Sequence, residues 1–470
     1  MLDLEGIVAA TGGKLYDERD RAVRGFSIDT RTIAEGDVFV PLSGSRTDGH
    51  QFIEEAYEKG AAASLAESKD YRKESPFNLV VVDDTERALL DMAHYYRNSF
   101  QIPIIGVTGS WGKTTTKELI ASMLSTSGKV HKSPGNYNTE FGLPLALLEM
   151  EQGVDYAVFE LGLQYPGDVE KLSKVLEPTV GLITAVGKVH LGNFSGTREI
   201  AREKLGITAG MDRDAKLIIG GDYPTLLEEA EKKFDLEPIL FGTRSENSLS
   251  YRGEKIQIRG TDGIELTVNS DLCPDSSPFP FVLESKLNSR GNALNLLGAV
   301  AVALELGLNP RDLKSRQKVE PIDQRLQPVE TSLGTVINDT YNANPRATEN
   351  ALNYLKRIEP SGEKVFVFGD MMELGEAANE LHRSLAGAVR SAGVDVLYSV
   401  GNHTGTLVEQ LNRTNEAGKE VEAKWFGSKS ELTSNLEDRL TGDDNLLLVK
   451  GSREMEMEKI VSFLEQEKKN

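Results

Sequence analysis

The chain has 470 residues, of which 39% are hydrophobic and 27% are charged, a composition typical of soluble globular proteins. Its length suits roughly three domains of about 150 residues each. The net charge of −20 argues against nonspecific binding to nucleic acid or to an anionic membrane, because both need a cationic surface. A single cysteine, Cys273, excludes an intramolecular disulfide. With no signal-peptide pattern and no long apolar run, we expect a cytoplasmic protein that does not insert into membranes.

The first part of the chain, residues 1–99, alternates short apolar runs with helical patterns. DVFVPL and NLVVVDD predict strands, while HQFIEEAYEKGAAA and TERALLDMAHYYRNSF predict helices, which together indicate a small α/β domain. Polar residues that favour turns surround the first strand: Ser27, Asp29, Thr30, Arg31, Gly44, Asp48, Gly49 and His50. By residue type alone, this cluster indicates turn chemistry.

A glycine-rich turn opens the second part, residues 100–319. The apolar run IPII leads into GVTGSWGKTTTKE, residues 106–118, which predicts a strand, a turn and a helix. Val107 stands where the strict P-loop pattern has its first glycine. Backbone N–H groups and the helix N-terminus bind phosphate in such a turn, Lys113 reaches the terminal phosphates, and Thr114 offers a hydroxyl to Mg²⁺. We expect ATP or a related nucleotide to contact Gly109, Ser110, Trp111, Gly112, Lys113, Thr114 and Thr115.

Further apolar runs in this second part, DYAVFELG and VGLITAV, continue the rhythm of a doubly wound parallel sheet. Glu160 ends the first of them and His190 follows the second; taken alone, each is a loop or structural residue. Lys204 lies in the helical segment TREIAREKLG and by itself is a surface lysine, with Lys188 and Arg202 as rival cations.

Two groups of polar residues interrupt the apolar pattern of the second part. Asn136, Asn138 and Thr139 lie in GNYNTEFG, where the residue types alone indicate a hydrogen-bonding loop. Asn292 and Asn295 share one face at the start of the apolar helix ALNLLGAVAVALELGL, and helix capping would explain one of them.

The third part, residues 320–470, predicts strands at GTVINDTY, KVFVFGDM, VLYSVG and NLLLVKGS, separated by helices. This alternation indicates a Rossmann-like α/β domain. VFVFGD and LLLVKGS run from apolar residues into glycine and charge, which places polar groups at the carboxyl ends of strands, where open α/β sheets bind ligands.

Several motifs, in this order along the chain, resemble those of the ATP-dependent Mur ligases of cell-wall precursor synthesis. They are TGSWGKTTTKE, GNYNTEFGLPLALL, FELG, the segment 190–204, NDTYNANP, GDMMELG and LVKGSREMEMEKI. TYNANP, GDMMELGE and KGSR are most similar to the branch that adds D-alanyl-D-alanine to UDP-N-acetylmuramoyl-tripeptide. SIDTRTIAEGDVFVPLSGSRTDGHQFIEEAYEKGAAA is similar to the uridine-nucleotide-binding domain of that branch.

The resemblance implies an α/β fold of three domains: residues 1–99 bind the UDP substrate, residues 100–319 form a central P-loop ATPase-like domain that binds ATP, and residues 320–470 bind the amine substrate. It also implies a reaction in which ATP phosphorylates a carboxylate to an acyl phosphate that the amine then attacks. Such a site gathers anions and needs Mg²⁺, cationic side chains and helix N-termini rather than a protein nucleophile.

The resemblance assigns roles to individual residues. It implies that Lys113, Glu160, His190 and Lys204 are catalytic, and that Thr114, Glu160, His190 and a carbamylated Lys204 hold the metal. It adds Asn292, Asn295, Arg325 and Asp339 to the ATP site. The implied UDP-substrate site contains Ser27, Asp29, Thr30, Arg31, Gly44, Asp48, His50, Asn136, Asn138 and Thr139. The implied amine pocket contains Tyr341, Asn342, Asn344, Lys450, Ser452 and Arg453, and an arginine suits a free carboxylate.

The chain departs from the family pattern at three places. Trp111 replaces a small polar residue, Gly291 replaces a histidine, and Gln164-Tyr165 replaces an Asn-His pair. They leave open a Mur-type or polyglutamate-type ligase with a different amine, although the uridine-type first domain argues against the folate branch. A nucleotide-binding scaffold with a degenerate site is a further alternative, but the five intact residues Lys113, Thr114, Glu160, His190 and Lys204 argue against it. We expect a monomer that acts on small molecules.

Overall fold

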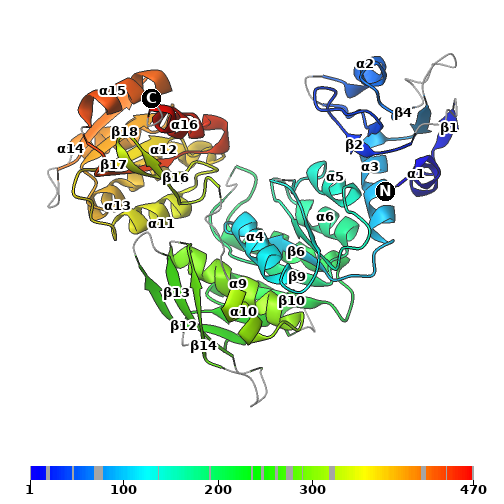
Figure 1. Cartoon of the computed structure of the whole chain (residues 1–470), viewed down its shortest axis with the longest axis horizontal. Helices are drawn as coiled ribbons and strands as arrows, with labels where there is room; N and C mark the ends of the chain where they lie inside the picture. The colour runs from blue at the N-terminus through cyan, green and yellow to red at the C-terminus, as the bar shows by residue number, and fades with distance from the viewer. Residues whose placement is uncertain are drawn as a thin grey trace.

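The structure is a computed structural model, and its backbone forms three sheets, each made from its own stretch of chain. It describes residues 2–16, 22–44, 47–67, 78–135, 137–189, 192–233, 237–244, 248–259, 263–270, 272, 279–287, 289–316, 323–413, 420–440 and 442–467. Figure 1 shows three lobes, with the first and the third standing above the second. The expected α/β fold is confirmed, whereas the domain limits stay a prediction and the limit at 319/320 lies outside the described residues.

The first sheet has the strand order β1-β5-β4-β3-β2, with β1 antiparallel to β5 and the other pairs parallel. Its elements are α1 (Leu4–Thr11), β1 (Lys14–Tyr16), β2 (Gly25–Ser27), β3 (Asp37–Phe39), η1 (Gly49–Phe52), α2 (Ile53–Glu58), β4 (Ala63–Glu67), β5 (Leu79–Val82) and α3 (Thr85–Arg97). The predicted strands at DVFVPL and NLVVVDD are confirmed as β3 and β5. The helix predicted at HQFIEEAYEKGAAA is shorter than expected, because Gly60 takes a left-handed φ of +101° and the following alanines lead into β4.

The second sheet has the order β14-β13-β12-β11-β10-β9-β6-β8-β7. Its strands are β6 (Ile104–Thr108), β7 (Val130–Lys132), β8 (Tyr156–Glu160), β9 (Val180–Ile183), β10 (Lys216–Gly220), β11 (Ile239–Gly242), β12 (Tyr251–Ile258), β13 (Ile264–Ser270) and β14 (Phe281–Ser285). Its helices are α4 (Lys113–Leu124), α5 (Gly142–Leu148), α6 (Asp168–Leu176), α7 (Thr197–Lys204), η2 (Leu205–Gly210), α8 (Pro224–Lys233), α9 (Arg290–Glu305) and α10 (Pro310–Arg316). Neighbouring strands from β7 to β12 run parallel, and β12 to β14 form an antiparallel meander.

Strand β6 occupies the point of this sheet where the strand order reverses. From β6 the chain passes to β7 and β8 on one side and then to β9 on the other. Helices cover both faces: Ile104 packs in one apolar cluster, and Ile105 and Val107 pack in a second cluster with α4 and α9. Val107 is thus a core strand residue, which explains why the glycine expected at this position by the strict P-loop pattern is absent. The carboxyl end of β6 is the place where open α/β sheets bind ligands.

The third sheet has the order β15-β16-β20-β17-β18-β19, with only β15 antiparallel to its neighbour among the described strands. Its strands are β15 (Gln327–Thr331), β16 (Gly334–Asp339), β17 (Lys364–Gly369), β18 (Val396–Val400), β19 (Glu422–Phe426) and β20 (Asn445–Lys450). Its helices are α11 (Pro345–Leu355), η3 (Gly375–Ala377), α12 (Ala378–Ser384), α13 (Ala386–Ser391), α14 (Gly405–Arg413), α15 (Lys429–Arg439), η4 (Arg453–Met455) and α16 (Glu458–Glu467). The four predicted strands are confirmed as β16, β17, β18 and β20, and the edge strands β15 and β19 were not predicted.

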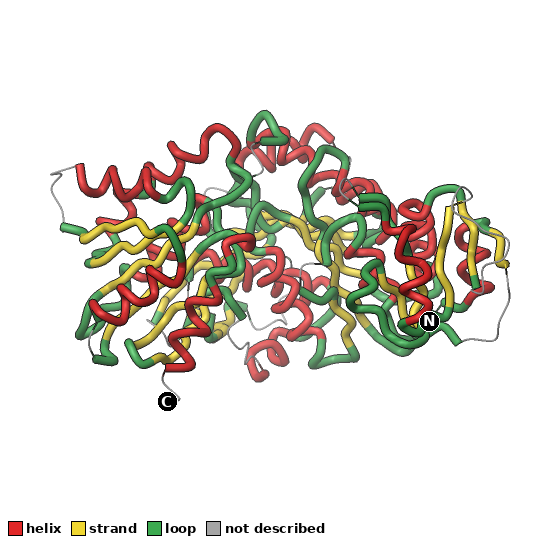
Figure 2. The backbone as a smooth tube through the Cα atoms, turned by 90° about the horizontal axis from the view of Figure 1, so that it is seen from above, coloured by secondary structure: helices red, strands yellow, loops and turns green. Residues whose placement is uncertain are grey.

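Helices flank the strand layers on both sides, as the view from above shows (Figure 2). In β17, Val365 and Val367 pack on one face of the third sheet and Phe366 and Phe368 on the other, so both faces are covered. No helix within the described ranges has the length and apolar character needed to cross a membrane.

Helix α3 joins the first domain to the second by packing against α5 and α6. The hydroxyl of Tyr96 donates to the Met150 carbonyl at 2.7 Å. Arg97 is 9% exposed, and its guanidinium donates to the carbonyls of Leu176 (2.8 Å) and Glu177 (2.7 Å) at the end of α6. These charge-assisted bonds satisfy carbonyls that the end of α6 leaves unpaired.

Arg97→Ala should therefore lower the thermal unfolding midpoint, because two charge-assisted hydrogen bonds at this junction contribute about 2 kcal/mol or more. Arg87→Ala is the matched control, since Arg87 lies on the same helix with a side chain that is 80% exposed. The Arg87→Ala substitution should change the free energy of unfolding by no more than about 0.5 kcal/mol. Differential scanning calorimetry of both variants checks this, and equal shifts would contradict the role of Arg97.

Candidate functional site

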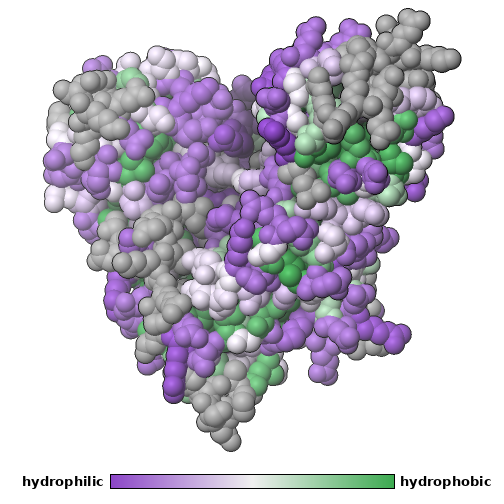
Figure 3. Space-filling view, turned by 45° about the vertical axis from the view of Figure 1, so that its right-hand side comes forward, coloured by the Kyte–Doolittle hydropathy of each residue, from purple (hydrophilic) through white to green (hydrophobic). Residues whose placement is uncertain are grey.

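A cleft of about 440 Å³ lies between the carboxyl ends of the second and third sheets. The space-filling view shows a hollow between the two upper lobes with hydrophilic side chains along it (Figure 3). The predicted residues that line the cleft are Ser110, Trp111, Gly112, Lys113, Thr114, Thr115, Asn138, Thr139, Glu160, Asn292, Asn295, Arg325, Asp339, Tyr341, Asn342, Asn344, Lys450, Ser452 and Arg453. Residues distant in the sequence therefore meet in one cavity.

The phosphate turn owes its shape to glycines. Gly112 precedes α4 with a φ of +82°, and a Cβ there would overlap the side-chain oxygen of Asn295. Gly109 has a φ of +156°, and a Cβ there would overlap the hydroxyl of Thr184. Since no side chain caps α4, the N–H groups of its first turn remain available to an anion.

Lys113 and Thr114 begin α4 and face the third domain. The Lys113 ammonium donates to the Gly109 carbonyl at 2.8 Å. The Thr114 hydroxyl accepts a 2.7 Å hydrogen bond from the guanidinium of Arg325, which lies 4.0 Å from the centre of the Tyr341 ring. Burial lowers the pKa of Lys113, and the nearby carboxylate of Glu160 opposes that shift. The turn thus meets a cation from the third domain.

Glu160 ends β8 and is buried, with 1% of its surface exposed. Asn138 donates to its Oε2 at 3.3 Å, whereas its Oε1 has no hydrogen-bond partner. The ammonium of Lys117, itself buried, lies 3.5 Å from Oε1 and donates to the Ser133 carbonyl at 2.6 Å. A buried carboxylate oxygen left without a hydrogen bond, on the wall of the cleft, is suited to a cation.

These side chains fit Mg²⁺, which binds through oxygen and keeps several waters and substrate phosphates among its ligands. Such a site needs only one or two carboxylates, and Glu160 offers one in the same cleft as the Thr114 hydroxyl. No group of three or more His, Cys, Asp or Glu side chains is gathered for a metal in the described part of the chain. His190, the other predicted metal ligand, lies outside the described residues.

Lys204 ends α7 and is buried behind the described wall of the cleft. Burial lowers its pKa well below the ordinary value for lysine, and the positive charge of Lys113 lowers it further. Among the described residues, no hydrogen bond or ion pair is recorded for its ammonium. The rival cations lie elsewhere: Lys188 is exposed, and Arg202 pairs with Glu229 at 2.6 Å.

The predicted amine pocket is held together by polar contacts at the third sheet. The buried ammonium of Lys450 pairs with Asp339 Oδ2 at 2.6 Å and donates to the Asn342 carbonyl at 2.9 Å. Asn344 caps α11 by accepting from the N–H of Ala347. In the same pocket, the buried Ser452 hydroxyl donates to the Ala343 carbonyl, whereas Arg453 is exposed and pairs with Glu458. Arg453 is therefore the pocket cation with the most solvent-accessible side chain.

The start of α9 corrects one interpretation. Ser289, not an asparagine, caps this helix by accepting from the N–H of Asn292 at 3.0 Å. Asn295 donates to the side-chain oxygen of Asn292 at 3.3 Å, so the two side chains hold one another at the cleft. Ser289, three residues before Asn292, was the available signal, because serine is a preferred N-cap residue.

The structure shows what surrounds each of the three departures from the family pattern. Trp111 packs edge-on against Tyr223 at 6.1 Å, and its ring fills the space where a Cβ on Gly187 would lie. At Gly291 a Cβ would meet nothing closer than 3.5 Å. The N–H groups of Gln164 and Tyr165 both donate to Asp168 at the start of α6.

The predicted uridine cluster does not line this cleft, whose described residues belong to the second and third sheets and their helices. Ser27, Asp29 and Arg31 form a turn in which the hydrogen-bonded guanidinium lowers the pKa of Asp29 to about 2. Thr30 offers its carbonyl to Lys59, the Gly44 N–H donates to the Thr47 carbonyl, and Asp48 caps η1 and contacts His50 at 2.7 Å. Asn136 lies outside the described residues.

Sequence reasoning missed one buried lysine beside Glu160 and other charged residues that line the cleft. Lys117, four positions after Lys113, lies among the apolar residues of α4, and this placement was the available signal. Glu140 and Lys171 line the second-domain wall and pair at 2.6 Å. Glu373 lies on the third-domain wall, in a motif that was used only for family resemblance.

A glycine turn with a free helix N-terminus at the reversal point of one α/β sheet, met by Arg325 of the third domain, is typical of a nucleotide-dependent enzyme. Comparison with known families agrees domain by domain. The Mur ligase family catalytic domain matches residues 22–97, the Mur ligase middle domain matches residues 107–303, and the Mur ligase glutamate ligase domain matches residues 324–453. The chain belongs to the Mur ligase family.

Individual relatives match over nearly the whole chain. UDP-N-acetylmuramoyl-tripeptide--D-alanyl-D-alanine ligase of Bacillus subtilis is 32% identical over 448 residues, which cover 94% of this chain and 93% of that protein. A crystal structure of MurF from Acinetobacter baumannii is similar with a TM-score of 0.85 and 26% identity, over 99% of this chain and 98% of that one. MurF ligase from Thermotoga maritima in complex with ADP has a TM-score of 0.79 and 27% identity, over 96% and 99%.

Gly112→Ala should weaken ADP binding at least tenfold, because a left-handed alanine costs about 1–2 kcal/mol and its Cβ would overlap Asn295. Gly153→Ala is the matched control: Gly153 has a φ of +79° but open space around it. Isothermal titration calorimetry with ADP separates overlap in the cleft from backbone strain alone. Unchanged affinity in the Gly112 variant would rule out this turn as the nucleotide site.

Proposed function

We propose that this chain is the ATP-dependent amide ligase that adds D-alanyl-D-alanine to UDP-N-acetylmuramoyl-tripeptide in peptidoglycan precursor synthesis. The observation that carries this proposal is the 32% identity to the Bacillus subtilis enzyme over 94% of the chain. The presence of Lys113, Thr114 and Glu160 in one cleft supports a working site rather than a degenerate scaffold. Since one chain supplies the described residues of the cleft, we propose that the protein is a monomer. We also propose that it is cytoplasmic, as expected from the sequence.

The second domain provides the groups for phosphate transfer. The unpaired N–H groups at the start of α4 and the ammonium of Lys113 bind the phosphates of ATP. Arg325 approaches from the third domain, where its guanidinium is placed to pair with a phosphate oxygen. Glu160 and Thr114 would hold Mg²⁺, which neutralises charge on the transferring phosphate. Asn292 and Asn295 contact the nucleotide, and Asp339 meets its ribose.

The two substrates enter from opposite sides of this phosphate site. Asn138 and Thr139 line the wall of the second domain and bind the pyrophosphate and sugar of the UDP carrier. The residues proposed to hold its uridine are Ser27, Asp29, Thr30, Arg31, Gly44, Asp48 and His50. Tyr341, Asn342 and Arg453 line the third-domain wall and bind the amine substrate. The exposed guanidinium of Arg453 suits the free carboxylate of a dipeptide.

Lys204 is proposed to work as a carbamate. A lysine whose pKa is strongly lowered is a neutral amine over a wider pH range and can react with CO₂. The product replaces a buried cation by an anion close to Lys113, which removes the repulsion between the two ammonium groups. His190 and this carbamate complete the proposed metal site.

A phosphate-release screen tests the function. Purified protein with ATP and Mg²⁺ is offered UDP-muramoyl di-, tri- and tetrapeptides, each crossed with D-alanyl-D-alanine and with single amino acids. Phosphate should appear only when tripeptide carrier and D-alanyl-D-alanine are both present. Turnover with another amine would assign the chain to a different branch of ligases, and no turnover with any amine would favour a scaffold.

Lys204→Ala should reduce turnover at least 100-fold, and added acetate or formate should restore part of it by supplying a carboxylate in the vacated space. Lys188→Ala, which removes an exposed lysine nearby in sequence, should retain activity. Nuclear magnetic resonance with ¹³C-labelled CO₂ gives an independent readout, because the wild type should show a carbamate signal that Lys204→Ala lacks. A wild type without that signal would contradict the carbamate.

A further inference from the structure

The loop after β17 reaches into the cleft but has no role in the site as described above. Met372, Glu373 and Leu374 line the third-domain wall. Glu373 has a φ of +60°, a left-handed conformation that is costly for a residue with a side chain. Such a conformation persists only where the surroundings determine it, and it is often found where a side chain must be aimed.

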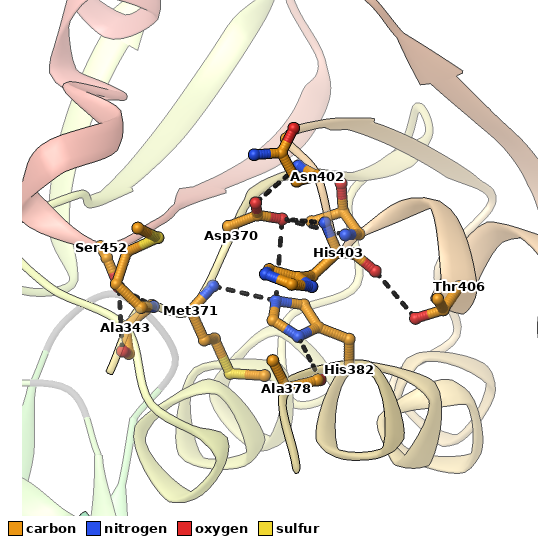
Figure 4. Close-up of polar contacts among 12 residues, drawn as sticks. Ala343, Asp370, Met371, Ala378, His382, Asn402, His403, Thr406 and Ser452 are labelled. Atoms are coloured by element: carbon orange, nitrogen blue, oxygen red, sulfur yellow. Dashed lines mark hydrogen bonds and ion pairs between the residues drawn. The ribbon is translucent and has the colours of Figure 1, made fainter. Parts of the chain in front are cut away.

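A buried carboxylate anchors the start of this loop. Asp370 is 2% exposed, and its two oxygens accept backbone N–H groups of Asn402 (2.6 Å), His403 (2.9 Å) and Thr404 (2.9 Å) from the loop between β18 and α14 (Figure 4). All three donors come from consecutive residues of a neighbouring connection. The loop after β17 is therefore tied to the loop that follows the neighbouring strand β18.

Two further side chains hold the residues that follow. The Met371 N–H donates to His382 Nε2 at 2.9 Å, and His382 Nδ1–H donates to the Ala378 carbonyl at 2.7 Å (Figure 4). Burial lowers the pKa of His382, which favours the neutral ring that this pattern requires. The Met372 N–H donates to the hydroxyl of Ser452 at 2.8 Å. Each residue leading to Glu373 is thus fixed by a hydrogen bond from a different element.

Glu373 lines the same cleft as Lys113 of the phosphate turn. Burial lowers the pKa of Lys113, and the carboxylates of Glu160 and Glu373 both oppose this shift, whereas Arg325 adds to it. On the third-domain side, the other charged residues that line the cleft are Arg325, Asp339, Lys450, Arg453 and Glu454. The same loop approaches the second domain, since a Cβ on Gly375 would lie 3.7 Å from the Cα of Gly192.

We propose that Glu373 binds the ammonium group of the amine substrate and accepts its proton before the amine attacks. An N–H bond of the ammonium breaks as an O–H bond forms on the carboxylate of Glu373. The nitrogen lone pair then bonds to the carbonyl carbon of the acyl phosphate, the carbon–oxygen bond to phosphate breaks, and a second nitrogen proton leaves with the phosphate. With an α-amino pKa of about 8, roughly nine-tenths of the amine is protonated at pH 7 and needs such a base.

The inference rests on the proposed function, so its test compares two nucleophiles on one enzyme. Hydroxylamine is neutral at pH 7 and traps an acyl phosphate as a hydroxamate without needing a base. Glu373→Gln keeps the size of the side chain but removes its basicity. It should form hydroxamate from ATP and the UDP-muramoyl tripeptide at the wild-type rate, while kcat/KM for D-alanyl-D-alanine falls about 100-fold.

Glu376→Gln is the matched control, because Glu376 is exposed three residues further on and lies outside the described cleft wall. It should behave as wild type with both nucleophiles. Glu373→Gln with normal dipeptide kinetics would overturn the inference, and so would an equal loss with both nucleophiles, which would place Glu373 in phosphate transfer. A wild type that forms neither hydroxamate nor amide would instead overturn the proposed function.

Discussion

The backbone reversal at Gly112 is the constraint around which the rest of the cleft is arranged. Its left-handed conformation lets α4 begin at Lys113 without a side-chain cap, so the helix presents unpaired N–H groups. Asn295 occupies the space that a Cβ would need, which brings the start of α9 against the turn. Thr114 then accepts from Arg325, so the third domain also meets α4 at this point.

Two buried lysines lie beside carboxylates at or next to the cleft. Lys117 and Lys450 each lie beside a carboxylate, Glu160 and Asp339 respectively. The 3.5 Å separation between Lys117 and Glu160 exceeds the length of a strong charge-assisted bond. Lys117 therefore places a positive charge beside Oε1 of Glu160, the oxygen without a hydrogen bond, while its own hydrogen bond goes to the Ser133 carbonyl. Lys204 stands apart from this pattern, because burial and the charge of Lys113 both disfavour its ammonium form.

Local patterns predicted what depends on local chemistry. The phosphate turn, the strands β16, β17, β18 and β20, and the alternation that defines the α/β class follow from glycine positions and apolar periodicity. The edge strands β15 and β19 escaped prediction because their residues are partly exposed and carry no continuous apolar run. The capping serine at 289 was overlooked because two asparagines nearby offered the same chemistry.

Relations between distant residues were beyond local patterns. Lys117 was missed because a lysine in a helix is usually solvated, and its burial depends on Ser133 and Glu160 from other elements. The grouping of Arg325 with Thr114 was expected only through family resemblance. Glu373 was also beyond local patterns. It lines the same cleft as Lys113 only because the third sheet faces the second.

The third domain contributes to the cleft from the carboxyl ends of its parallel strands. Asp339 and Lys450 are partners in the register of β16 and β20, and their buried ion pair fixes the ends of both strands. The segments that follow β16, β17 and β20 begin at these carboxyl ends, and they contribute Tyr341, Glu373 and Arg453 to the cleft wall. If either Asp339 or Lys450 were replaced by an uncharged residue, the other would remain as an uncompensated buried charge. Substitutions at these two positions should therefore be strongly destabilising.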